Sequence, residues 1–183
     1  MSILVLKKSV LDLFRYATVD VYGTNEEPAK GTVEYLAGQL TKIGYKPKLH
    51  LLAHGVYFQT IGNQATKAQA GYTDWYQDYP HPIDWFDTLL NGNRITQTHN
   101  NNVGNVNVKS VDAEIEALKK ITTLTPAVNA RWAKVDRDLM VTYATTVPYL
   151  NRSSTDFFST KMDMSCYMFN VVQYWDWGVS CQK

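Results

Sequence analysis

The chain has 183 residues, 45% hydrophobic and 19% charged, and this balance predicts a globular protein rather than a disordered one. Its 18 basic and 17 acidic residues give a formal charge of +1, so no electrostatic footprint for nucleic acid or an anionic membrane is visible. No run of residues approaches the length of a transmembrane helix, and residues 3–6 are too short for the hydrophobic region of a signal peptide.

The chain begins with a segment whose role stays open. Residues 1–15 place apolar side chains at helical spacing, so they form either a leader or a helix that packs on the domain. Residues 16–22 then alternate and are rich in β-forming residues, which predicts a strand that ends at Gly23. Thr24 and Glu27 follow at the spacing of a capping box, and they predict the start of a helix.

This helix should lead into a second strand. Gly44 stands where a C-terminal helix cap belongs, and residues 46–52 predict the strand, with Leu49 and Leu51 on one face. A strand, a helix and a strand joined by short links form a βαβ unit, which implies a parallel sheet. The inward face of the helix is predicted to contain Val33, Leu36, Ala37, Leu40 and Ile43.

A third strand is expected to end near the middle of the chain. Residues 56–64 predict a short helix, and residues 68–75 predict a strand that reaches the carboxyl edge of the sheet, where open α/β sheets bind ligands. Residues 82–90 predict another helix, with Asp84 and Asp87 on its solvent side.

A long polar loop comes next. Residues 91–107 hold seven asparagines without periodicity, which predicts a solvated loop. A ligand contact from Asn100, Asn101 or Asn102 is the less favoured alternative.

The last part of the chain is predicted to be helical and then irregular. Ser110 is the expected cap of one helix, and Thr125 with Pro126 opens another. A strand is expected over residues 145–150 and a further one near Phe157. The inward stripe of the second helix is predicted to contain Trp132, Val135, Leu139, Met140 and Tyr143.

Residues 71–90 mix large aromatic side chains with carboxylates in one dense stretch. An unpaired buried carboxylate is costly, so the expected setting is the end of a strand that opens into a cleft. Aromatic walls there would hold a small ligand while a few polar groups orient it. The aromatic residues are Tyr72, Trp75, Tyr76, Tyr79, Trp85 and Phe86, and the carboxylates are Asp74, Asp78, Asp84 and Asp87.

The same stretch resembles the W-x-x-D-Y-x-x-P segment of the family 5 solute-binding proteins, the peptide-binding receptors of ABC importers. Trp75, Asp78, Tyr79 and Pro82 occupy its fixed positions, and similarity extends over residues 16–183. The resemblance implies an α/β fold of the periplasmic-binding-protein-like type, in which helices flank a mixed, mostly parallel sheet.

The resemblance also implies a biological role. This chain would be the C-terminal lobe of a two-lobed receptor, the substrate-binding component of an ABC transporter. Its implied partners are a peptide or other small solute, the ABC permease subunits and a missing N-terminal lobe, with no cofactor and no nucleic acid. Full-length relatives are extracytoplasmic, either periplasmic or cell-surface lipoproteins. In an exported protein Cys166 and Cys181 suit a disulfide, whereas the sequence alone equally allows two free thiols.

Ligand contacts follow from the same resemblance. It places the Asp78 carboxylate against the free amino group of the ligand and Trp75 along the cavity wall. Tyr76, Gln77 and Tyr79 are further ligand-binding candidates, although strand alternation lets only some of them face a cleft.

The residues alone leave structural roles open for the two main candidates. Asp78 can instead cap the turn at Tyr79 and Pro80 or bond Arg94, and Trp75 can be a core residue between sheet and helix.

Other function classes use the same residues differently. A stand-alone carbohydrate-binding module would stack sugars on Trp75, Tyr79 and Trp85, and a remnant of a truncated gene would bind nothing. A glycosidase needs two carboxylates about 5–9.5 Å apart. Asp74 and Asp78 can span more than that on an extended segment, and nothing else supplies a partner, so an enzyme is not predicted. A metal site is not predicted either, because the histidines match no ligand pattern.

Overall fold

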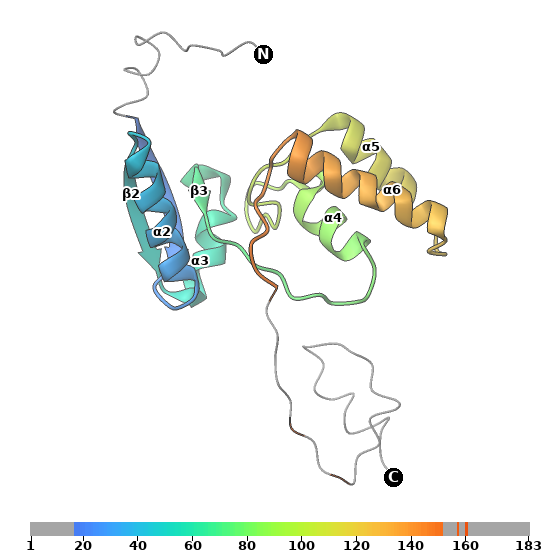
Figure 1. Ribbon diagram of the computed structural model, residues 1–183, viewed down its shortest axis with the longest axis horizontal. Coiled ribbons are helices and arrows are strands. Elements are labelled where there is room, and N and C mark those ends of the chain that lie inside the picture. The colour runs from blue at the N-terminus through green and yellow to red at the C-terminus, as the bar shows by residue number, and fades with distance from the viewer. Residues whose placement is uncertain (1–16, 152–156, 158–159, 161–183) are drawn as a thin grey trace. The chain divides into compact units, whose positions relative to one another are not determined.

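The computed structural model describes residues 17–151 together with Phe157 and Thr160, and the chain divides into two compact units (Figure 1). The first unit extends to Asp74 and includes Thr96–Asn100, and the second comprises Trp75–Ile95 and the chain from Asn101 onward. Residues 1–15, Cys166 and Cys181 lie outside the described residues, as does most of the strand expected near Phe157.

The first unit contains a parallel sheet of three strands in the order β2-β1-β3. Strand β1 (Thr18–Thr24) pairs with β2 (Lys46–Leu52) along its whole length, and helix α2 (Ala29–Lys42) connects the two and packs on both. The predicted βαβ unit, the parallel sheet and the α/β fold class are therefore confirmed.

The third strand is much shorter than residues 68–75. Strand β3 (Ala70–Gly71) pairs with β1 over two residues, and the Tyr72 N–H that follows it donates to the Tyr22 carbonyl. The close approach explains the glycine, because a Cβ at Gly71 would lie 2.7 Å from the Tyr22 carbonyl oxygen.

The two ends of α2 are capped differently from one another. The predicted capping box is wrong, since the Thr24 hydroxyl donates to the Glu26 carbonyl and the Glu27 carboxylate accepts from the Gly31 N–H inside the first turn. The C-terminal cap is confirmed, because Gly44 has a φ of 100° and follows the last turn in a Schellman arrangement. Ile43 is 68% exposed and not inward, because it is the C-cap residue and its backbone has left the helix.

Helix α3 (His54–Ile61) secures the start of the segment that follows β3. The Tyr57 side chain is fully buried, and its hydroxyl lies 2.5 Å from the Tyr72 carbonyl oxygen and 3.1 Å from that of Tyr22. Burial raises the pKa of the Tyr57 hydroxyl well above its ordinary value, so it stays protonated and can donate. Tyr57 thus ties β1 to the chain that leaves β3.

Replacing Tyr57 by Phe is expected to lower the free energy of unfolding by about 1–2 kcal/mol, because the buried carbonyls lose their shared donor while the ring still fills its space. Urea unfolding followed by far-UV circular dichroism measures the loss. Tyr35→Phe on the exposed face of α2 is the matched control. Equal losses in the two variants would show that the Tyr57 hydroxyl contributes nothing to stability.

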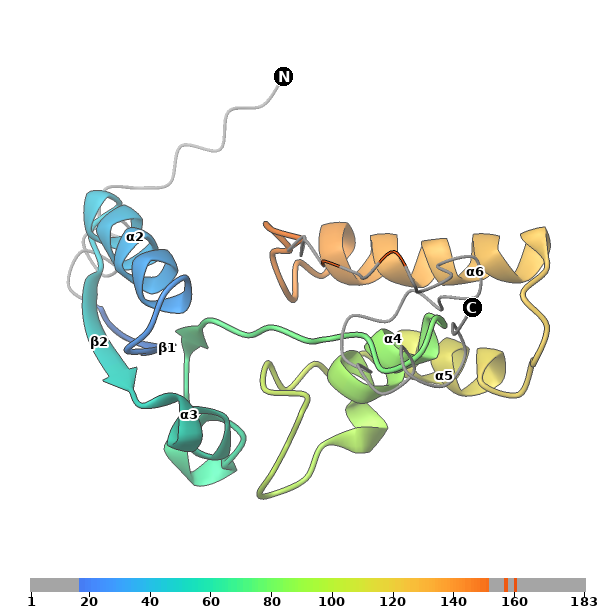
Figure 2. The ribbon, with the colours of Figure 1, turned by 90° about the horizontal axis from the view of Figure 1, so that it is seen from below.

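The second unit is built from helices α4 (Ile83–Leu90), α5 (Lys109–Leu118) and α6 (Pro126–Arg137). In Figure 2, α5 and α6 run side by side, with α4 beside α5. Trp132 of α6 stacks on Phe86 of α4, with ring centroids 5.6 Å apart. The buried core consists of Leu90, Val106, Val111, Ile115, Leu118, Val128, Trp132, Val135 and Leu139.

The ends of these helices correct several predictions. Ser110 is not a cap, because α5 begins one residue earlier and Val108 holds the N-cap position. The Thr125 cap is confirmed, since its hydroxyl oxygen accepts from the Val128 N–H. Tyr143 is 47% exposed, because a π turn over Asp138–Thr142 widens the spacing and moves it off the inward stripe.

The strand expected over residues 145–150 is also wrong. These residues form no helix or strand, and Val147 and Leu150 are exposed. Alternation of apolar residues forms a strand only where a neighbouring strand can pair with it, and the three described strands all belong to the first unit.

Candidate functional site

The site predicted from the sequence lies in the segment that leads into α4 in the second unit. The Trp75 ring is half-buried, and its indole Nε1–H donates to Asp84 Oδ2 over 3.2 Å. The backbone N–H of Asp78 donates to the same carboxylate oxygen over 3.0 Å. A single buried oxygen therefore holds both of the residues for which the sequence predicts the main ligand contacts.

The side chains around Asp78 reach solvent. Asp78, Tyr76 and Tyr79 are exposed, so the residue at position 78 is not sealed inside the unit. Gln77 is half-buried, and its Nε2 donates to the Tyr79 carbonyl over 2.9 Å, which fixes the turn between them.

The two carboxylates of α4 are buried, which contradicts the prediction that they face solvent. Asp84 is 1% exposed and Asp87 is 6% exposed. Asp87 lies 2.5 Å from Arg94 Nη2 and 2.9 Å from Lys119 Nζ, and it accepts a hydrogen bond from Asn91. Arg94 thus bonds Asp87 directly. Both carboxylates have hydrogen-bond partners, and these offset the free-energy cost of burying them.

The ionisation of Asp87 follows from these contacts. Burial alone would raise its pKa, but the hydrogen bonds from Arg94, Lys119 and Asn91 outweigh burial and hold the pKa below its ordinary value. Asp87 is therefore a carboxylate at neutral pH and carries its charge inside the unit.

The neighbouring charged side chains act on the Tyr79 hydroxyl. Burial is the largest cause of a raised pKa at the Tyr79 hydroxyl, and the charges of Asp84, Asp87 and Asp78 raise it further, while Arg94 acts in the opposite direction.

Neither Asp84 nor Asp87 was selected from the sequence as a buried residue. One signal was present, because Asp84, Asp87 and Asn91 follow one helical face at spacings of three and four, and Leu90 lies beside them. Polar residues that lie on the same helical face as buried apolar residues indicate a buried hydrogen-bond network rather than a solvated surface.

The asparagine-rich loop is packed rather than solvated. Asn91, Asn100 and Asn102 are buried, so the expectation of a solvated loop is wrong for them, whereas Asn101 is exposed. The Asn102 amide donates to the carbonyls of Asn91 and Val106, and its oxygen accepts from the Val106 N–H. The Asn102 side chain thus acts as an internal partner for the backbone of the loop.

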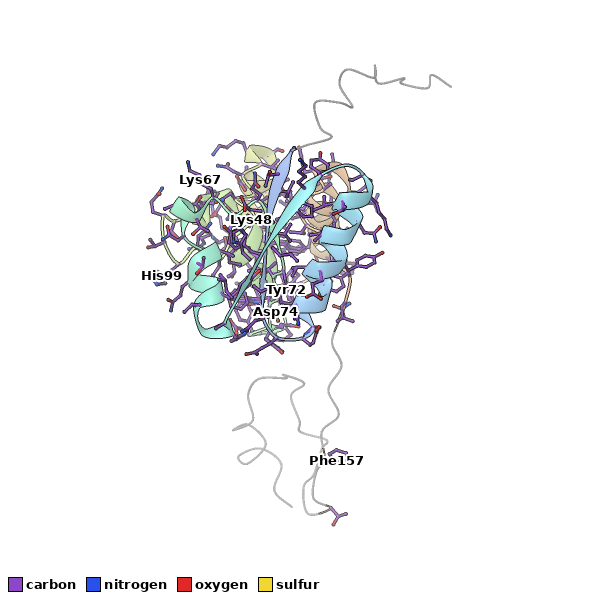
Figure 3. All side chains as sticks on the ribbon, turned by 90° about the vertical axis from the view of Figure 1, so that its left-hand side faces the viewer. Lys48, Lys67, Tyr72, Asp74, His99 and Phe157 are labelled. Atoms are coloured by element: carbon purple, nitrogen blue, oxygen red, sulfur yellow. The ribbon has the colours of Figure 1, made fainter. Side chains whose placement is uncertain are left out.

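Asp74 belongs to the first unit and is engaged locally. The Tyr72 hydroxyl donates to Asp74 Oδ2 over 2.9 Å, and Figure 3 labels both side chains. The Asp74 carboxylate is therefore engaged by a residue two positions before it in the chain.

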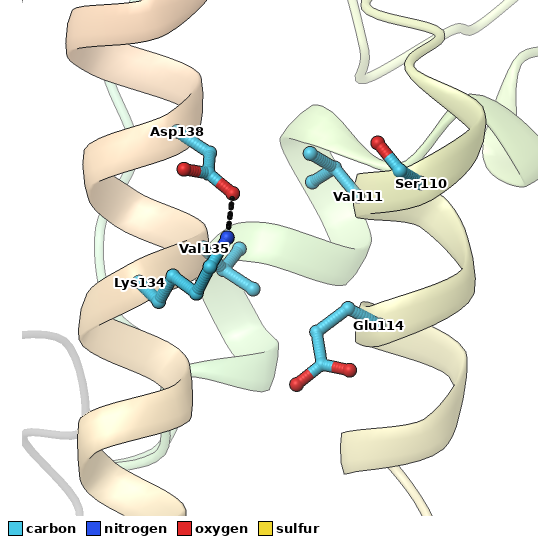
Figure 4. Close-up of a pocket in the computed structure, with 6 residues that line it drawn as sticks. All are labelled: Ser110, Val111, Glu114, Lys134, Val135 and Asp138. Carbon is cyan, nitrogen blue, oxygen red and sulfur yellow. Dashed lines mark hydrogen bonds and ion pairs between the residues drawn. The ribbon is translucent and has the colours of Figure 1, made fainter.

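A shallow hollow of about 270 Å³ lies between α5 and α6 (Figure 4). Its charged side chains are already paired, Lys134 with Asp138 at 2.6 Å and Glu114 with Arg131 at 2.7 Å. None of the ligand-binding candidates lines it; the lining residues are Ser110, Val111, Glu114, Lys134, Val135 and Asp138.

No helix among the described residues has the length and apolar character needed to cross a bilayer. Within the same residues, no three His, Cys, Asp or Glu side chains gather as a metal site would require.

The fold belongs to the periplasmic-binding-protein-like class, with a small parallel sheet flanked by helices. No protein-family model and no curated protein matches the sequence. Among solved structures, the chain is similar to oligopeptide binding protein 2 of clavulanic acid biosynthesis, with a TM-score of 0.62 and 20% identity over 72% of this chain and 25% of that one.

Two further structures of peptide transport proteins are similar. One is the oligopeptide ABC transporter substrate-binding domain from Bacillus anthracis str. Ames, with a TM-score of 0.59 and 16% identity over 72% of this chain and 24% of that one. The other is the ABC transporter-associated periplasmic binding protein DppA from Helicobacter pylori, in complex with a peptide, with a TM-score of 0.56 and 19% identity over 71% of this chain and 24% of that one. The chain spans about a quarter of the length of these proteins.

Proposed function

We propose that this chain is one lobe of a solute-binding receptor of an ABC importer, and that it contributes one wall of a site for peptides or similar small solutes that carry a free amino group. The observation that carries the proposal is that the exposed residue Asp78 and the half-buried Trp75 are held by the same group: the Asp78 backbone N–H and the Trp75 indole N–H both donate to Asp84 Oδ2. The fold shared with peptide-binding transport proteins supports it.

The mechanism follows from the two-lobed arrangement that the proposal assumes. The Asp78 carboxylate pairs with the ammonium group of the ligand, and the Trp75 ring borders the adjoining part of the ligand. When a second lobe closes over them, water leaves and the charge-assisted hydrogen bond becomes stronger than it is in the open. The ligand shifts the receptor to the closed form only to the extent that it bridges both lobes, and the closed form then docks on the permease.

The present chain on its own should therefore bind weakly. With only one wall of the site present, we expect a dissociation constant of about 1 mM or higher. This corresponds to a binding free energy of about −4 kcal/mol or less favourable. A micromolar affinity measured by calorimetry on the 183-residue chain would contradict the proposal that a second lobe is needed.

Weak binding of this kind is measurable by nuclear magnetic resonance. In ¹H–¹⁵N spectra, trialanine at millimolar concentration is expected to shift the Trp75 indole signal, and N-acetyl-trialanine is expected to shift it much less, because acetylation removes the cation that Asp78 would bind. Asp78→Asn should remove the difference between the two peptides. The indole signal that disappears in Trp75→Phe is assigned to Trp75.

Asp136→Asn, a substitution of an exposed carboxylate on α6, is the matched control and should leave both titrations unchanged. Identical shifts with the two peptides, or none with either, would overturn the proposed amine contact. Quenching of tryptophan fluorescence by chito- or cello-oligosaccharides would support a carbohydrate-binding module instead.

A further inference from the structure

The buried Asp84 carboxylate has an unusual pair of partners. Its Oδ2 atom accepts from the Trp75 indole N–H at 3.2 Å and from the Asp78 backbone N–H at 3.0 Å. Among the described residues, Asp84 takes part in no salt bridge. A carboxylate that is 1% exposed needs donors, and here both of these come from the segment that carries the candidate site.

Asp84 is itself held in place by the core of the second unit. It lies in the first turn of α4, and its helix neighbours Ile83, Phe86 and Leu89 pack against the core cluster. Phe86 in turn stacks on Trp132. The position of Oδ2 is therefore set by the packed helices, whereas residues 75–79 have no helix or strand of their own.

We propose that Asp84 is the positioning residue of the ligand-binding segment: one carboxylate oxygen fixes the Trp75 ring and the Asp78 main chain in a set relation before a ligand arrives. The assignment rests on the proposed function, in which Trp75 and Asp78 contact the ligand. Its physical benefit is preorganisation, since the ordering of the two residues is completed on folding and does not oppose binding.

The first test needs no ligand and uses the full chain. Hydrogen exchange at the Trp75 indole N–H and the Asp78 amide is followed by nuclear magnetic resonance. In the wild type, the Trp75 indole should exchange more slowly than that of Trp85, which is 38% exposed. In Asp84→Ala both protons should exchange at least about tenfold faster, while the Val135 amide in the core of α6 is unchanged.

Asp84→Asn provides the rescue. Its side-chain oxygen can still accept both hydrogen bonds, so exchange should stay within about threefold of the wild type. A wild-type Trp75 indole that exchanges as fast as that of Trp85 overturns the assignment, even if Asp84→Ala does not fold. Equal acceleration at Val135 in a folded Asp84→Ala also overturns it, because the role would then be general stability.

The second test separates this inference from the proposed function. Trialanine should bind Asp84→Ala at least about fivefold more weakly than the wild type, a change of about 1 kcal/mol, and Asp84→Asn within about twofold. Equal affinities of the wild type and Asp84→Ala would contradict the positioning role and leave the proposed function unaffected. If the wild-type chain shows the predicted exchange pattern but binds no peptide, the proposed function is contradicted instead.

Discussion

Replacing Trp132 by Ala is expected to lower the free energy of unfolding by about 3–5 kcal/mol, a loss typical of a large aromatic residue removed from a core. Trp132 is 3% exposed, stacks on Phe86 and meets His81 edge-on, so its loss leaves a cavity between α4 and α6. Chemical unfolding followed by far-UV circular dichroism measures the change without relying on tryptophan emission.

Trp132→Phe distinguishes packing from polarity at this position. The indole Nε1 is buried and has no hydrogen-bond partner in the described structure, so the native residue already bears the cost of an unsatisfied donor. A Phe ring retains the stacking and removes that donor, and we expect a loss below about 2 kcal/mol. Trp85→Ala on the exposed side of α4 is the control and should cost less than about 1 kcal/mol. Equal losses for Phe and Ala at position 132 would contradict this account.

Asp87→Ala is the second substitution with a large expected effect, about 3 kcal/mol of unfolding free energy at neutral pH. Removing one partner of a buried ion pair costs about 3–5 kcal/mol. Lys119 would keep its charge while only 22% of its side chain is exposed, and the buried Asn91 amide would lose an acceptor. Arg94 adds little, because 54% of its side chain is in solvent and its attraction is screened.

The effect should depend on pH in a defined direction. Since the pKa of Asp87 is lowered on folding, its contribution is complete above the ordinary Asp pKa of about 3.9 and is lost as pH falls through the lower folded-state value. The stability difference between the wild type and Asp87→Asn should therefore shrink between about pH 5 and pH 2. Asp136→Asn, an exposed change, should show no such convergence. A difference that is constant over this range would refute the assignment.

Local patterns predicted the first unit well. The strand positions of β1 and β2 follow from alternation, and the end of α2 follows from Gly44, which alone can adopt the positive φ of the cap without strain. The third strand was overestimated because its length depends on how far β1 stays beside it, and this contact ends after Tyr72.

Non-local partners explain what the sequence did not predict in the second unit. An aspartate is expected in solvent by default, but Asp87 is buried because Arg94, Asn91 and, at the end of the next helix, Lys119 supply partners for its carboxylate. Asp84 is likewise buried because Trp75, nine residues earlier, folds back to meet it. The pattern W-x-x-D selected Trp75 and Asp78, but it contained no sign that Asp84 holds them.

The packing of Asn91 has a consequence for the chemical lifetime of the chain. An Asn followed by Gly is the dipeptide in which the backbone nitrogen of the glycine most readily attacks the side-chain amide, a reaction that leads to a succinimide and loss of ammonia. Here the Gly92 N–H is bonded to Asp112, and the Asn91 amide is bonded to Asp87 and Glu116. Both the attacking Gly92 nitrogen and the Asn91 amide are restrained by these hydrogen bonds. We therefore expect deamidation at Asn91 to be slower in the folded chain than in the unfolded one.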